Sequence, residues 1–62
     1  MRHRITNEGQ FSISITHMSG NDETGYRPEG RVVKPGETFE GDIRSVHHGS
    51  NHAQYRVEPL DI

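Results

Sequence analysis

The chain contains no cysteine and few of the residues that build helices or large cores. Without cysteine, disulfides and zinc sites with thiolate ligands are excluded. One Leu and one Ala stand against five Ile and four Val, and β-branched side chains pack well on a pleated sheet but lose rotamer freedom in a helix. Hydrophobic residues make up 27% of the chain, and no apolar run approaches the length of a membrane span. We therefore expect an all-β protein with a small core.

Size and charge narrow the classes of function. The 62 residues form one domain, 1–62, and so small a domain usually needs disulfides, a metal or association with another chain. With disulfides excluded, we expect oligomerisation or docking on a larger partner to supply the stability that the small core lacks. The net charge of −2 argues against a dedicated nucleic-acid-binding protein, which normally carries a basic stripe. The N-terminal Met1–Arg4 leads into no apolar segment, so we expect a soluble, non-secreted protein of the cytoplasm or of a virion.

Turn residues divide the chain into five extended runs, at about 2–6, 10–18, 31–34, 37–46 and 53–58. The second run is the clearest, because apolar and small polar side chains alternate from Phe11 to Thr16. Asn7–Gly9 predicts a hairpin between the first two runs, and Pro35–Gly36 predicts a type II turn. Gly41 and the out-of-phase Val46 indicate a β-bulge. We expect a five-stranded antiparallel fold, either a small SH3-like barrel or a short β-sandwich.

Residues 19–30 contain three glycines, a proline and several other turn formers, which predicts a long exposed loop. Tyr26 and Arg27 lie in this loop, and Arg31 follows it. Tyr and Arg are residue types that anchor protein interfaces, so these three are predicted to bind a partner. The excess of six Arg over one Lys fits an interface, although ordinary surface arginines would give the same count.

The run from Phe11 to His17 contains no charge and no proline. Such a strand is prone to aggregation when its edge is exposed, and proteins usually protect edges with Lys, Pro or bulges. Either it lies in the middle of the sheet, or another chain covers it. Its polar side chains, Ser12, Ser14 and Thr16, form a small, flat face that would pack closely against a neighbour.

Five histidines are many for a chain of this length. His47 and His52 would face each other across a hairpin with His48 near its tip, which makes them weak candidates for binding zinc or copper. They equally suit polar loop residues, and because no carboxylate stands at a ligand spacing we expect no metal or other cofactor. Asp42, Ser45, His47 and His48 are residue types of nucleophilic catalysis. No strained nucleophile turn or phosphate-binding glycine loop accompanies them, so we expect no enzyme.

The small core, the unprotected strand and the exposed loop favour a non-enzymatic structural or accessory protein. It would act through protein contacts as a β-rich homo-oligomer or docked on a larger assembly. In its size, its composition and the turn at 32–39, the chain resembles the small all-β accessory proteins of tailed phages, such as capsid decoration proteins. The resemblance implies a capsid shell as the partner. The alternative is a small protein-binding inhibitor, such as a phage anti-defence protein, which would form a complex of fixed stoichiometry with one soluble target.

Overall fold

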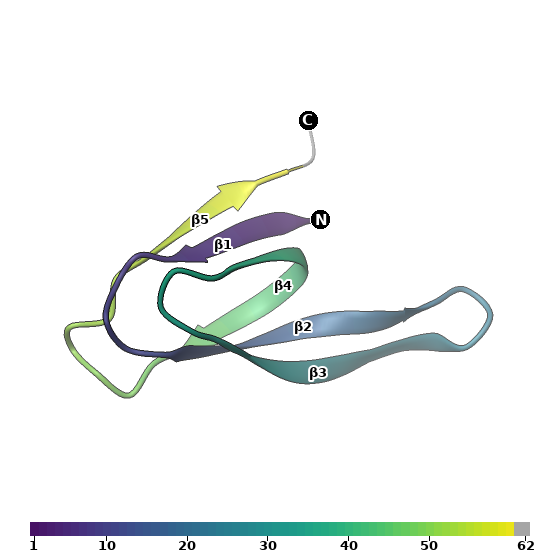
Figure 1. Ribbon diagram of the computed structural model, residues 1–62. Helices are drawn as coiled ribbons and strands as arrows, with labels where there is room; N and C mark the ends of the chain where they lie inside the picture. The colour runs from purple at the N-terminus through teal and green to yellow at the C-terminus, as the bar shows by residue number, and fades with distance from the viewer. Residues whose placement is uncertain (61–62) are drawn as a thin grey trace.

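The computed structural model describes residues 1–60 and places five antiparallel strands in one sheet (Figure 1). The strands are β1 (His3–Asn7), β2 (Ile13–Asn21), β3 (Gly25–Val33), β4 (Thr38–His47) and β5 (Tyr55–Pro59). Their order across the sheet is β3-β2-β4-β1-β5. The prediction of an all-β protein with five antiparallel strands is therefore confirmed.

The sheet is not closed into an SH3-like barrel, and a single sheet does not make a sandwich. Closure would require β3 to pair with β5, and these two strands are the opposite edges of the sheet. Much of β3 instead belongs to a long hairpin with β2 that extends well beyond the other strands (Figure 1). The result is an elongated, thin molecule with principal extents of 39 × 25 × 15 Å.

Strand β4 joins the two halves of the sheet. Its residues 38–41 pair with β1, and its residues 42–47 pair with β2. The register with β2 shifts between the Thr16–Ser45 and His17–Ile43 pairs, which leaves Arg44 as an extra residue. This is the bulge expected from the hydrophobic pattern, and a bulge bends its strand.

The predicted hairpin between the first two strands is wrong, because β1 pairs with β4 and β5 rather than with β2. The buried side chain of Asn7 explains the different path. Its Nδ2 donates to the carbonyls of Phe11 at 2.8 Å and Val33 at 2.9 Å, and its Oδ1 accepts from the N–H of Gly9 at 3.0 Å. These bonds hold the connection across the end of the β2–β3 hairpin instead of letting it fold back along β1.

The predicted loop at 19–30 is also wrong, although residues 20–30 are exposed as expected. They form the outer part of the β2–β3 hairpin, whose turn is only three residues long. The Oδ1 of Asn21 accepts from the N–H groups of Glu23 and Thr24, both at 2.9 Å. Gly20 is required here, because its φ is +126° and a Cβ would lie 2.0 Å from the Gly25 carbonyl oxygen. Two of the three glycines that suggested a loop, Gly20 and Gly25, therefore serve a tight turn.

The core lies where β1 crosses the base of this hairpin. Within residues 1–60, the buried apolar side chains are Ile5, Ile13, Ile15 and Val33. Partly buried neighbours surround them: Phe39, Ile43, Val46, Ala53 and Tyr55. The alternation in β2 correctly predicted Ile13 and Ile15, but β2 begins at Ile13, and Phe11 is 49% exposed. The predicted type II turn is confirmed, since Gly36 has a φ of +83° and the Glu37 N–H donates to the Lys34 carbonyl at 2.9 Å.

Candidate protein-contact surface

One face of the β3-β2-β4 part of the sheet holds small, uncharged side chains. Because Ile13 and Ile15 point into the core, Ser14 and Thr16 point the other way. Ser14 is in register with Val32 and His47, and Thr16 is in register with Gly30 and Ser45. We call these residues the outer face: Ser14, Thr16, Gly30, Val32, Ser45 and His47. None of these six residues is Asp, Glu, Lys or Arg, and Val32 is 57% exposed; the next position on the same face brings in a charge, since Asp42 is in register with Met18.

The six residues predicted to bind a partner do not form one site. Ser14 and Thr16 belong to the outer face, and Ser12 lines a shallow pocket of about 260 Å³ beside it, together with Val32 and His47. Tyr26 lies near the hairpin turn, where its hydroxyl donates to the Asp22 carboxylate at 3.0 Å.

Arg27 and Arg31 lie on the opposite face of β3, since successive residues of a strand alternate between faces. The guanidinium of Arg31 lies over the Phe39 ring, 4.8 Å from its centroid, and the His17 ring contacts the same Phe39 at 4.7 Å. The predicted contact residues are thus distributed over both faces of one hairpin.

The strand suspected of being covered by another chain is β2, and it lies between β3 and β4. The backbone of residues 14–18 is therefore paired on both sides, which explains why this part of β2 needs no Lys or Pro to protect it. Among the predicted contact residues, those of β2 can contact a partner only through their side chains. The free backbone edge on this side of the sheet belongs to β3.

The histidines do not come together as predicted. β1 separates β4 from β5, so His47 and His52 do not face each other across a hairpin. His47 Nε2 lies 3.0 Å from the Ser45 hydroxyl, and His48 Nδ1 lies 3.0 Å from the Ser50 carbonyl. Within the described part of the chain, no group of three or more His, Cys, Asp or Glu side chains could hold a metal ion.

The residues with catalytic side chains are only partly brought together. Ser45 and His47 form the hydrogen bond just described, but the Asp42 carboxylate pairs with Arg44 at 3.1 Å and with the N-terminal amine at 3.9 Å. This arrangement differs from a nucleophilic triad, in which the carboxylate orients the histidine.

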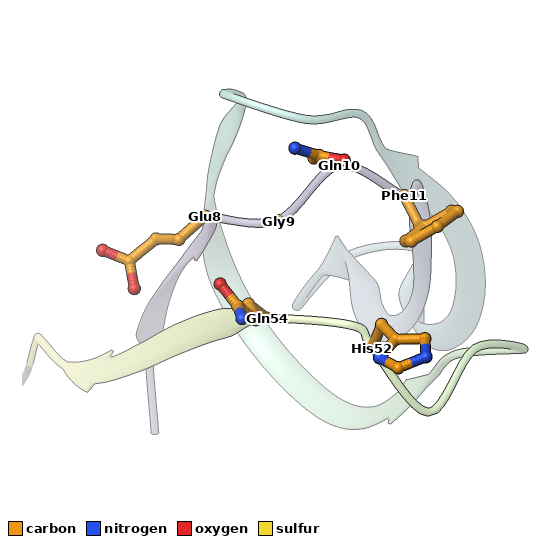
Figure 2. Close-up of a pocket in the computed structure, with 6 residues that line it drawn as sticks. All are labelled: Glu8, Gly9, Gln10, Phe11, His52 and Gln54. Atoms are coloured by element: carbon orange, nitrogen blue, oxygen red, sulfur yellow. The ribbon is translucent and has the colours of Figure 1, made fainter.

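A pocket of about 230 Å³ lies between the connection after β1 and the segment before β5. Figure 2 shows the rings of Phe11 and His52 at one side of this pocket, with Gln54 and Glu8 toward the other. Gly9 packs directly on the backbone of Gln54, where an added Cβ would lie 3.0 Å from the amide nitrogen. Nothing in the sequence pattern indicated this pocket, because Phe11 was expected to continue the apolar row of the second strand and the two segments that form the pocket are more than 40 residues apart in the chain.

The arginines divide into two groups. Arg4 pairs with Glu40 at 2.7 Å, Arg44 pairs with Asp42, and Arg56 lies within 3.5 Å of Glu8 and 3.7 Å of Glu58. The hydrogen bond and the charge of Glu40 raise the pKa of Arg4 above its ordinary value, so the Arg4 guanidinium stays charged at any physiological pH. Among residues 1–60, Arg27 and Arg31 take part in no ion pair. The two arginines of β3 therefore form no ion pair within the described residues, although Glu29 lies between them on the same face of the strand.

No helix among residues 1–60 has the length and hydropathy needed to cross a membrane. The chain has no significant match among protein-family models, curated proteins or solved structures.

Proposed function

We propose that this chain is a non-enzymatic structural or accessory protein that works through protein–protein contacts made by its β2–β3 hairpin. The observation that carries the proposal is the exposure of β3, in which every residue from Gly25 to Val32 is exposed. Pairing of β2 with β4 ends at Met18, so the outer part of the hairpin stands alone. An isolated two-stranded hairpin is marginally stable in water, and a partner that covers it would stabilise it.

The composition of the hairpin supports a protein partner. It combines the uncharged outer face with the exposed Tyr26, whose ring is amphipathic and loses little conformational entropy on binding. The partner is a second copy of the chain or a larger assembly, such as a virion or capsid shell to which the protein docks as a decoration protein. The small core agrees with this, because a domain with few buried side chains gains stability by association.

Photocrosslinking in the cells or particles that contain the protein tests the proposal. A photoreactive residue replaces Tyr26 or Val32 in the hairpin, and Asn51, an exposed residue of the loop before β5, is the matched control. Crosslinks from the hairpin positions to one protein or to a second copy, absent from the Asn51 position, are the expected result. Equal labelling at all three positions, or none, contradicts the proposal.

Sedimentation of the purified chain over a range of concentrations separates the two kinds of partner. A homo-oligomer dissociates on dilution, and a Thr16→Arg substitution on the outer face should abolish it. Thr6→Arg, on the far part of the sheet and equally half-buried, should not. A complex of fixed stoichiometry with one soluble target, absent from particles, would indicate an inhibitor instead.

A further inference from the structure

The two edges of the sheet differ in how they are protected. The β5 edge has five residues, ends at Pro59, and carries Arg56, whose charge Glu8 and Glu58 neutralise. The β3 edge has nine residues, from Gly25 to Val33, and its two arginines, with Glu29 between them, form no ion pair among residues 1–60. A strand of five residues that ends in proline offers few backbone groups for further pairing, so the longer β3 is the more open of the two edges.

Pro28 shows which backbone groups of β3 face outward. It is in register with Met18, and because proline has no N–H this pair cannot exchange ladder hydrogen bonds. Hydrogen-bonded and non-bonded pairs alternate along an antiparallel ladder, so every second residue turns its N–H and C=O toward the free edge. These residues are Tyr26, Gly30 and Val32, together with the Pro28 carbonyl.

The open part of the edge is short and well defined. Pro28 blocks pairing on its N-terminal side, since its ring occupies the position of a donor. After Val33, the Lys34 N–H donates to the Glu37 carboxylate at 2.9 Å, and the Lys34 carbonyl accepts the Glu37 N–H at 2.9 Å. The N–H and C=O groups of Gly30 and Val32 remain between these two limits.

Gly30 points to the same stretch independently. Its φ is not positive, and a Cβ added to it would meet nothing within 4 Å, so nothing within the described chain requires glycine there. Glycine weakens the interior of a strand and often marks a place where another backbone approaches closely. The exposed Val32 beside it offers an apolar side chain for the same contact.

A second copy is a poor occupant of this edge. Two β3 edges could pair around a two-fold axis with Gly30 of one copy opposite Val32 of the other. In that register the Arg31 side chains of the two copies lie directly opposite each other, and like charges in that arrangement destabilise the pairing. If the axis passes through Gly30 instead, Pro28 falls opposite Val32 in a hydrogen-bonded position and cannot donate. A segment with acidic residues avoids both conflicts and neutralises the free positive charge.

We infer that the β3 edge at Gly30–Val33 binds an extended acidic segment of another protein as an added antiparallel strand. Gly30 and Val32 exchange backbone hydrogen bonds with alternate residues of that segment, and the residue between these faces Arg31. The Arg31 guanidinium already lies over the Phe39 ring, 4.8 Å from its centroid, which restricts its position before binding. This inference rests on the proposed function and narrows it from self-association to docking on a partner.

The test uses the full chain labelled with ¹⁵N and a blocked heptapeptide in which a central Glu is flanked by Val and Thr residues. The same peptide with Lys in place of Glu is the control probe. Titration with the Glu peptide should shift the amide signals of Gly30 and Val32 more than those of the β5 edge. Binding of the Lys peptide should be about tenfold weaker, as expected for the loss of one charge-assisted contact.

Two variants of Val32 distinguish backbone pairing from side-chain contact. Val32→Pro removes the outward N–H but no bond to β2, and it should weaken binding of the Glu peptide about tenfold or more. Val32→Ala keeps the N–H and should bind the peptide within about threefold of the parent chain. If Val32→Pro fails to fold, Arg31→Glu replaces it, and that variant should prefer the Lys peptide.

Four results would overturn the inference. The first three are an absence of amide chemical-shift changes at millimolar peptide, equal binding of the Glu and Lys peptides, and unchanged binding of the Glu peptide by a folded Val32→Pro variant. The fourth is movement of the Gly30 and Val32 signals with protein concentration alone, which would make a second copy the occupant. Any of these four results leaves the proposed function standing if photocrosslinks from Tyr26 and Val32 to a protein are found. An absence of those photocrosslinks contradicts the proposed function itself.

Discussion

Replacement of Asn7 by Ala is the most informative test of how this small fold is held together. The Asn7 side chain is 1% exposed and makes all three of its hydrogen bonds to backbone groups. Its bond to the Val33 carbonyl is buried, and leaving that group unpaired costs about 1–3 kcal/mol. The bonds to Phe11 and Gly9 are partly buried and contribute about 0.5–1 kcal/mol each. We therefore expect Asn7→Ala to lower the free energy of unfolding by about 2–5 kcal/mol.

The loss is large for this chain, because 62 residues at about 0.05–0.15 kcal/mol each give a total stability of only about 3–9 kcal/mol. Urea unfolding followed by far-UV circular dichroism measures the difference, with the exposed Asn51→Ala as the control expected to stay within about 0.5 kcal/mol. Asn7→Asp keeps the acceptor but replaces the donating NH₂ by an oxygen that faces two carbonyls, so at neutral pH it should lose at least as much. A loss below about 1 kcal/mol in Asn7→Ala would refute the view that this side chain directs the chain from β1 to β2.

Gly20→Ala should open the hairpin turn and lower the free energy of unfolding by about 1–3 kcal/mol, because the φ of Gly20 is +126° and the Cβ would meet the Gly25 carbonyl oxygen. The control, Gly30→Ala, should change the free energy of unfolding by no more than about 0.5 kcal/mol. Equal melting curves for these two variants would contradict the geometry of the turn. Ile13→Asp places a charge at a position that is 2% exposed and should unfold the domain at 25 °C. Val32→Asp places the same charge at a position that is 57% exposed on the neighbouring strand and should stay folded. Circular dichroism distinguishes the two outcomes. A chelator such as EDTA should not change the melting temperature, since His47 and His48 are engaged with Ser45 and Ser50, and a decrease would show a bound metal.

The strands could be predicted from the sequence wherever one residue type alternates with another. The alternation of Ile and Ser in β2 correctly identified two of the four buried apolar side chains of residues 1–60, and the out-of-phase Val46 correctly indicated a bulge in β4. Pro35–Gly36 correctly marked a turn, because the φ preferences of those residues are local. These features depend on neighbours in the chain, which a sequence displays directly.

Strand pairing could not be predicted in the same way. The chain from β1 to β2 looks like a hairpin connection, but Asn7 bonds to Val33, which is 26 residues away along the chain. The order β3-β2-β4-β1-β5 depends on such distant contacts. Likewise, Gly20 and Gly25 read as loop residues because glycine suits both flexible loops and tight turns, and only the contact between them distinguishes the two cases.

Residues that protect a strand from further pairing lie in the edge strands of this sheet and are missing from its interior strand β2. The absence of charge and proline in β2 left two interpretations open, a strand in the middle of the sheet or a strand covered by another chain, and the first is confirmed because β2 lies between β3 and β4. The edge strand β3 does contain a proline and charges, and these are the residues that protect an edge. In β3 the protection is incomplete, because Pro28 blocks one half and leaves the Gly30 and Val32 backbone groups open beside the unpaired charge of Arg31. A docking strand is therefore better sought where protective residues are present but leave a gap than where they are missing altogether.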